Sequence, residues 1–276
     1  MKYSIIKKTS SLAACVLFGL QLSPALATTF TLTDGNSEAT VDSMSQAGMS
    51  NWSVDGTDYL KQQWFWFRSD QVQLASINNL PLAQEMNPNA NELQLRYGTA
   101  GTFWLDVSYE LIGGPNGSGT AWLTENIEIT NNGNENLIFD FFQYSDFDLD
   151  PQGQDSVEIT NGDTATQNGA QASMTEEVTS ITPTSRVEAN FSPNTKNSLN
   201  TDPNYDLMKF FSDMAGPGDV TSSFQWEGAI GQGGSFIITK TKTLSVPPEP
   251  LPEPSTILLF GTGLLMAGLA RLKYRK

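Results

Sequence analysis

Short runs in which apolar and polar residues alternate, separated by clusters of turn-forming residues, constrain the fold of this chain more than any other feature. In residues 101–111 (GTFWLDVSYEL) the alternation places one apolar side chain at every second position, from Phe103 to Leu111. In residues 235–244, Phe236, Ile238, Lys240 and Lys242 likewise share one face. Many such runs with Gly, Asn, Pro and Asp between them are typical of an antiparallel β-sandwich. We therefore predict a single all-β, sandwich-like domain.

The same pattern predicts most of the remaining elements. Further strands are expected at 28–33, 61–68, 71–77, 92–97, 122–130, 136–144, 156–160, 172–180, 185–190 and 221–230. One helix is expected at 205–214 (YDLMKFFSDM), where Leu207, Phe210 and Phe211 would share a face.

Composition excludes several classes of function. The chain holds 30 acidic and 15 basic residues, no histidine and one cysteine. An excess of negative charge disfavours nucleic acid as a partner, because binding to phosphates needs clustered Lys and Arg. The absence of histidine removes Ser-His-Asp catalysis and most catalytic zinc sites. Since Cys15 lies in the N-terminal segment described next, the mature domain is expected to form no internal disulfide.

The N-terminal segment has the three parts of a secretory signal peptide. A basic start ending at Lys8 precedes an apolar run at 12–22, which is shorter than the ~20 residues of a membrane span. Ala25 and Ala27 then form the small-x-small pattern that signal peptidase accepts. We expect cleavage after Ala27, so that residues 1–27 are the signal peptide and 28–246 the acidic domain.

The C-terminal segment combines a spacer, an apolar helix and a basic end. Residues 247–256 are proline-rich and predict an extended linker. The apolar run 257–270 would span about 21 Å as a helix, less than the ~30 Å hydrocarbon core. The basic tail 271–276 is expected to stay in the cytoplasm, with the domain outside the inner membrane. A simple membrane anchor is the alternative interpretation.

The order of these parts is similar to the PEP-CTERM sorting signal of exported proteins in Gram-negative bacteria. The motif is carried by Pro252, Glu253 and Pro254, followed by the helix and the basic cluster. The resemblance implies processing by an exosortase, a membrane transpeptidase, and a link to exopolysaccharide, biofilm and the cell surface. A second Pro-Glu-Pro, at 248–250, lies too far from the helix to serve as the motif.

Phrases within the domain resemble a functionally unassigned group of exported PEP-CTERM proteins. These phrases are 52–56 (WSVDG), 63–68 (QWFWFR), 141–149 (FFQYSDFDL), 218–220 (GDV) and 224–226 (FQW). They span most of 28–246 and favour a single unit, but they imply no activity.

One acidic cluster has the residue types of a calcium site. Asp146, Asp148, Asp150 and Asp155 supply hard oxygen ligands, and the first three alternate along an extended segment. The cluster lacks the turn glycine and the final glutamate of an EF-hand. The competing interpretation is an acidic, solvated loop. Ca²⁺ is the only candidate cofactor that the sequence suggests.

Tryptophans raise the possibility of carbohydrate binding. Trp64 and Trp66 lie on one side of the 64–67 pleat and could stack on a glycan if that side is exposed. The alternative is a central strand buried on both sides, as a domain without disulfides would need.

Two acidic pairs are candidates for glycoside hydrolysis, which needs two carboxylates about 5 to 9.5 Å apart. Glu125 and Glu128, three residues apart in a strand, should point to opposite faces, and Glu176 and Glu177 should do so as well. We therefore expect a non-enzymatic surface or matrix protein. A carbohydrate-binding module is the alternative function, and a carboxylate-pair hydrolase is the third hypothesis.

Overall fold

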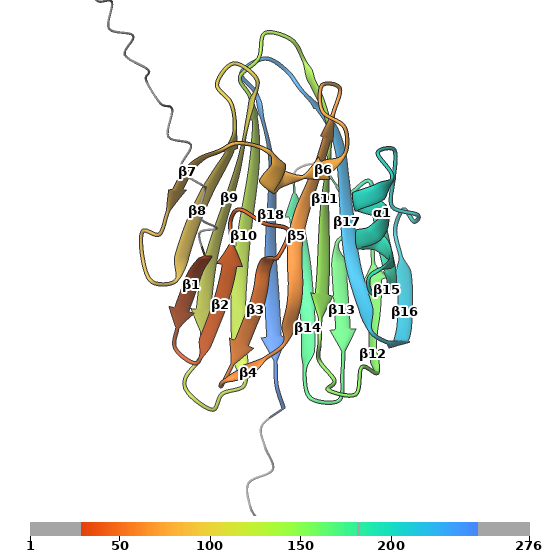
Figure 1. The fold of residues 1–276 in the computed structure, drawn as a ribbon. Coiled ribbons are helices and arrows are strands. Elements are labelled where there is room, and N and C mark those ends of the chain that lie inside the picture. The colour runs from red at the N-terminus through yellow and green to blue at the C-terminus, as the bar shows by residue number, and fades with distance from the viewer. Residues whose placement is uncertain (1–28, 181–182, 248–276) are drawn as a thin grey trace, which may run out of the picture.

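The computed structural model describes residues 29–180 and 183–247, which form two stacked β-sheets (Figure 1). Both sheets are built almost entirely from antiparallel pairs, as the alternating pattern predicts; β3 and β5 make a short parallel contact. The predicted all-β sandwich is therefore confirmed. The predicted signal peptide, sorting motif, apolar helix and basic tail lie outside the described residues. Within the described ranges, no helix has the length and apolar character needed to cross a membrane.

Sheet A has the strand order β1-β2-β3-β5-β11-β17-β15, with β4 added to β3 and β6 added to β5. Its strands are β1 Thr29–Asp34, β2 Ser37–Asp42, β3 Gly48–Val54, β4 Thr57–Asp58, β5 Leu60–Ser69, β6 Ala75–Ser76, β11 Leu137–Phe147, β15 Arg186–Phe191 and β17 Val220–Ile230. The central strands β5, β11 and β17 bury nearly all their side chains, because this part of the sheet is covered on both faces.

Sheet B has the strand order β16-β12-β13-β14-β18-β10-β9-β8-β7. Its strands are β7 Leu82–Met86, β8 Glu92–Gly98, β9 Phe103–Gly113, β10 Thr120–Asn131, β12 Asp155–Thr160, β13 Thr164–Asn168, β14 Ser173–Ser180, β16 Asp213–Gly218 and β18 Ser235–Ser245. Burial alternates along β9 and β10, so one face of this sheet meets the core and the other meets solvent. The predicted inward face of β9, from Phe103 to Leu111, is buried as expected.

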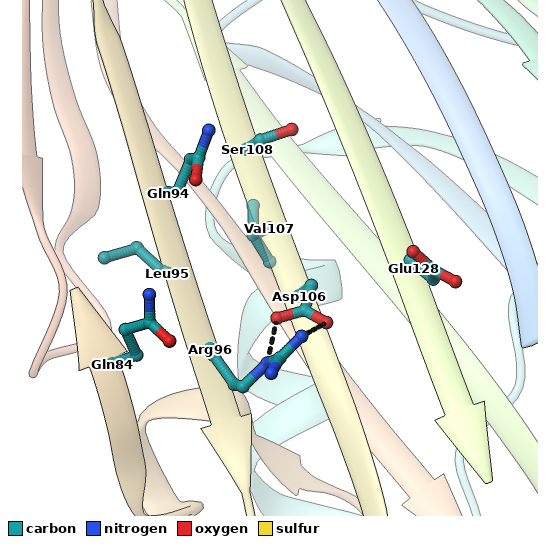
Figure 2. Close-up of a pocket in the computed structure, with 8 residues that line it drawn as sticks. All are labelled: Gln84, Gln94, Leu95, Arg96, Asp106, Val107, Ser108 and Glu128. Atoms are coloured by element: carbon teal, nitrogen blue, oxygen red, sulfur yellow. Dashed lines mark hydrogen bonds and ion pairs between the residues drawn. The ribbon is translucent and has the colours of Figure 1, made fainter. Parts of the chain in front are cut away.

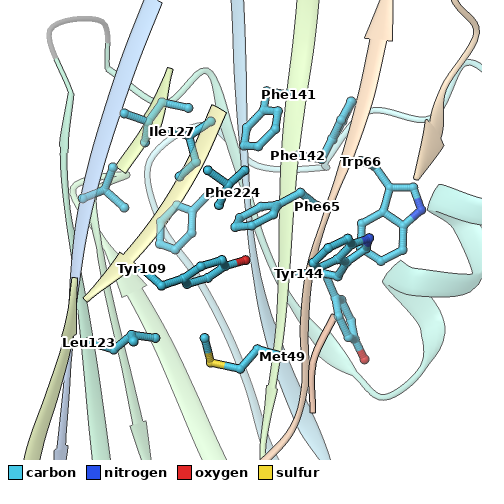
Figure 3. Close-up of a cluster of buried hydrophobic side chains, with 14 of the residues drawn as sticks. Met49, Phe65, Trp66, Tyr109, Leu123, Ile127, Phe141, Phe142, Tyr144 and Phe224 are labelled. Atoms are coloured by element: carbon cyan, nitrogen blue, oxygen red, sulfur yellow. The ribbon is translucent and has the colours of Figure 1, made fainter. Parts of the chain in front are cut away.

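Aromatic side chains fill the space between the sheets (Figure 3). Phe65 of β5 stacks on Phe141 of β11 with ring centres 5.4 Å apart, and Phe67 reaches across to Phe103 of β9 at 4.7 Å. Such pairs contribute about 0.5–1.5 kcal/mol each beyond the area they bury. The domain therefore obtains its stability from a broad aromatic core without a disulfide.

The predicted helix at 205–214 is wrong. Lys209 instead exchanges two backbone hydrogen bonds with Val187 of β15, and residues 213–218 form the edge strand β16 on β12. Leu207 is buried, whereas Phe210 and Phe211 are 58% and 74% exposed. Strand pairing over a long sequence distance has overridden the local helical spacing.

In the part of the chain that the structure describes, the helices are α1, Asn194–Thr201, and a single 3₁₀ turn, η1, Ile77–Asn79. Helix α1 contacts β15 and β6 and lies on the outer side of sheet A (Figure 1). Only Thr195 and Leu199, four residues apart, are buried. The helix thus buries only a narrow stripe, and its side chains also form hydrogen bonds to Trp66, Gln62 and Glu188.

Candidate functional site

The predicted tryptophan platform does not exist, because Trp64 and Trp66 are both fully buried. The Trp64 indole donates to Ser76 Oγ at 2.9 Å, and the Trp66 indole donates to Asn200 Oδ1 of α1 at 2.9 Å. Each polar edge is therefore satisfied inside the protein, and neither ring presents a face to a ligand. The alternative interpretation, a strand covered on both sides, describes β5 correctly.

The four aspartates of the predicted calcium site do not converge. The described residues contain no group of three or more acidic side chains placed to hold a metal ion. Each aspartate has its own partners: Tyr144 and Ser192 for Asp146, Lys61 for Asp148, the backbone amide of Gln152 for Asp150, and Gln167 with the amide of Leu149 for Asp155. The alternation fails because β11 ends at Phe147, so that Asp148 and Asp150 lie in the turn that follows, and Asp155 begins β12.

Within each of the two acidic pairs, the two glutamates point to opposite sides of sheet B, as expected. Glu125 and Glu176 are fully buried, whereas Glu128 and Glu177 are exposed. Neither pair is arranged to act together on a substrate.

A polar groove of about 420 Å³ lies on the outer face of sheet B, across β7, β8, β9 and β10 (Figure 2). Its polar side chains are Gln84, Gln94, Arg96, Asp106, Ser108 and Glu128. Strand register places these residues on one face: Gln84 is opposite Arg96, Arg96 opposite Asp106, Asp106 opposite Glu128, and Gln94 opposite Ser108. The alternation of polar and apolar residues along each strand is visible in the sequence. The groove could not be predicted from it, because the groove forms only where β7, β8, β9 and β10 lie side by side.

A bidentate ion pair fixes the centre of the groove. Arg96 Nε lies 2.6 Å from Asp106 Oδ1, and Nη2 lies 2.9 Å from Oδ2. The guanidinium also lies 5.5 Å from the ring centre of Trp104. The hydrogen bonds to Asp106 raise the pKa of Arg96 above its ordinary value. This arrangement holds a planar donor group at a fixed angle to the sheet.

Around this pair, several polar groups are free to bind a ligand. The amides of Gln84 and Gln94 make no hydrogen bond to any other described residue, and Glu128 has only a 3.5 Å contact from Thr130. Each glutamine supplies two donors and an acceptor, and Glu128 supplies acceptors. The groove therefore offers both kinds of hydrogen-bonding group over a shallow, open surface, which suits a polyhydroxylated ligand.

The two-sheet architecture is similar to that of solved sugar-related enzymes. A galactose mutarotase related enzyme from Lactobacillus acidophilus aligns with a TM-score of 0.52 and 9% identity, over 82% of this chain and all of that chain. A bacterial glucoamylase complexed with acarbose gives 0.51 and 8%, over 79% of this chain and 34% of that one. A putative aldose 1-epimerase from Escherichia coli K12 gives 0.47 and 15%, over 79% and 99%. At sequence identities this low, the similarity is one of fold alone.

Residues 250–276 match the family model of the PEP-CTERM protein-sorting motif. The chain thus carries the sorting signal of an exported exosortase substrate, and Pro252, Glu253 and Pro254 fall within the matched range. No match was found among curated proteins.

Proposed function

We propose that this is an exosortase-processed matrix or surface protein that binds a neutral extracellular polysaccharide through the groove on sheet B and catalyses no reaction. The observation that carries the binding part is the set of unpaired amides and one carboxylate around the rigid Arg96–Asp106 pair. Export and sorting follow from the motif at 250–276. Its partners in this scheme are signal peptidase, exosortase, the inner membrane through 257–270, and the polymer itself.

The charge of the exported domain favours a neutral polymer. Seven of the 15 basic residues lie in the two end segments, which hold no acid, so eight remain against all 30 acidic residues. Such a domain repels anionic chains, unless divalent cations bridge them. Uncharged sugar hydroxyls meet no such barrier and match the amide and carboxylate groups of the groove.

The carboxylates of the groove favour binding over hydrolysis. Of its two acids, Asp106 is neutralised by Arg96, which leaves Glu128 as the single unpaired carboxylate. Most enzymes that hydrolyse a glycosidic bond use a pair of Asp or Glu carboxyl groups that flank the bond. A lone glutamate can accept hydrogen bonds from a sugar but lacks the second group.

Binding can be tested by affinity electrophoresis through gels that contain exopolysaccharide from the producing bacterium. The double variant Gln94→Ala, Glu128→Ala removes hydrogen bonds worth about 1 kcal/mol each, so we expect retention to weaken about 10- to 30-fold. Glu158→Ala, an exposed change on β12 far along the same sheet, is the matched control and should bind like the wild type.

Two results would contradict the proposal. Equal retention of the wild type and the double variant would remove the groove as the binding site. Release of reducing ends from the polymer by the wild type, abolished in Glu128→Gln, would show that the protein is a hydrolase.

A further inference from the structure

Two lysines and two glutamates lie in the middle of the sandwich, where charged residues are rare. Lys240 and Lys242 of β18, Glu125 of β10 and Glu176 of β14 are each at most 1% exposed. Strand register sets Glu125 opposite Lys240 and Glu176 opposite Lys242. All four side chains project from sheet B toward sheet A, as their burial between apolar neighbours requires.

The ion pairs within this cluster are unequal. Glu125 holds Lys240 Nζ at 2.6 Å and Lys242 Nζ at 2.8 Å, whereas Glu176 lies 3.9 Å and 3.5 Å from the same atoms. Burying four charges costs several kcal/mol per ion, and apolar residues of similar size would often serve stability as well or better. Stability alone is therefore a weak reason for the cluster.

Sheet A presents an amide to this cluster. Gln143 of β11 accepts a hydrogen bond from Lys240 Nζ through Oε1, and its Nε2 donates to Glu176 Oε1 at 2.6 Å. The Gln143 carbonyl carbon Cδ is one C=O bond, about 1.2 Å, from Oε1. The distance from Lys240 Nζ to Cδ therefore exceeds its distance to Oε1 by at most that length. The Lys240 amine is thus held beside an electrophilic carbon, with one carboxylate at the amine and another at the amide nitrogen.

The surroundings are dry and aromatic. Lys240 Nζ lies 4.6 Å from the ring centre of Phe65, which stacks on Phe141. Figure 3 shows Phe65, Phe141 and Tyr109 converging in the space between the sheets. Burial lowers the pKa of Lys240 to about 8, which increases the fraction of nucleophilic amine at neutral pH. Burial raises the pKa of Glu125, but the two lysines outweigh it and hold that pKa below its usual range.

We propose that Lys240 and Gln143 join in an intramolecular isopeptide bond that links the two sheets covalently. The geometry that carries this is the contact of Nζ with the Gln143 carboxamide between two buried glutamates. No oxidant, cofactor or second protein is needed.

The reaction balances within the cluster. Glu125 accepts a proton from the Lys240 ammonium, and the free electron pair of Nζ forms a bond to Gln143 Cδ. A second proton passes from Nζ through Glu176 to Nε2, the Cδ–Nε2 bond breaks, and ammonia leaves. Before the reaction two ammonium groups balance two carboxylates; afterwards Lys242 balances Glu176, and Glu125 is protonated. The buried site therefore remains neutral throughout, which accounts for the presence of the second lysine.

Peptide mapping of the purified, exported full chain tests the bond. Protease digestion and tandem mass spectrometry should find a branched peptide that joins the segments around Gln143 and Lys240, lower in mass by one ammonia than the two separate peptides. Gln143→Met, of similar volume but without a carboxamide, should yield the two linear peptides. Glu176→Gln, which keeps the shape but cannot relay a proton, should yield mostly linear peptides.

The wild-type measurement is decisive even if these variants fold poorly. Linear peptides alone from the folded wild-type protein would overturn the proposal and leave the cluster as an ion-pair network. A branched peptide that has lost water instead of ammonia would also overturn it, because a glutamate would then be the acyl donor.

Discussion

Asp146 shows how burial changes the ionisation of a single carboxyl group. It is 4% exposed and accepts hydrogen bonds from the hydroxyls of Tyr144 and Ser192, each at 2.9 Å, through Oδ2. Its other oxygen has no hydrogen-bond partner among the described residues. Burial raises the pKa of this carboxyl above 3.8, since the ionised form loses more hydration than its two donors restore.

Asp146→Asn should therefore stabilise the domain in a pH-dependent manner. Because the folded pKa of Asp146 is raised, its contribution to stability is fully present below pH 3.8 and is lost as the pH rises through the folded pKa. Asparagine keeps the size and an acceptor oxygen but never ionises. Urea unfolding between about pH 4 and 7 should show the variant gaining on the wild type as the pH rises. A difference that stays constant across this range would contradict the assignment.

For single residues, the direction in which a side chain points could be predicted from the sequence where it depends on one strand alone. The opposite orientations of Glu125 and Glu128 follow from the pleat alone. The same alternation placed Lys240 and Lys242 on the face of Phe236 and Ile238, which is the signal that these lysines are buried. Their partners, Glu176 and Gln143, come from other strands, so spacing in the sequence could not identify them.

Among the elements, α1 buries a single apolar side chain. Leu199 is 1% exposed and is the buried apolar side chain of this polar helix, which also carries Asn200, the acceptor for the Trp66 indole. A helix of eight residues is marginal by itself and needs tertiary packing.

Leu199→Ala should loosen α1 from sheet A. Removing a buried leucine side chain typically costs about 2–5 kcal/mol of unfolding free energy. We also expect a red shift of tryptophan emission, because water would reach Trp66 as the helix detaches. Asn197→Ala, an exposed position on the same helix, is the control and should change stability by less than about 0.5 kcal/mol. Equal effects of the two changes would show that α1 is not held by Leu199.

Most strands with a regular alternation were predicted, but the predicted strand 71–77 is reduced to β6, Ala75–Ser76, followed by η1. The predicted 92–97 and 221–230 correspond closely to β8 and β17. By contrast, the polar strands β13 (TATQN) and β2 (SEATVD) were not predicted, and they form because neighbours on both sides supply backbone partners. The failure at 205–214 has the same cause, since pairing with β15 and β12 is invisible in a local window.

For the molecule as a whole, the position of β18 connects the core with the sorting segment. β18 pairs with β10 and β14 inside sheet B, carries both buried lysines, and is the last strand before the proline-rich linker. A pull on the C-terminal segment would therefore act first on β18. A bond from Lys240 to Gln143 would pass that load to β11, a central strand of sheet A, in a domain that has no cysteine of its own.

Sorting can be separated from folding because the motif lies outside the β domain. Glu253→Ala should leave export intact but block removal of the C-terminal segment, so that the protein stays larger and reaches a different final location. Deletion of 257–276 removes that segment directly and should leave export intact but change the final location. Immunoblotting of inner-membrane, surface and medium fractions would reveal both outcomes. The matched control is Glu249→Ala, in the second Pro-Glu-Pro at 248–250, since Glu249 precedes the matched range 250–276 and should be dispensable.

Unchanged mass and location in the Glu253→Ala variant would contradict exosortase processing at Pro252-Glu253-Pro254. Loss of processing in both variants would instead show that the enzyme recognises the whole proline-rich linker.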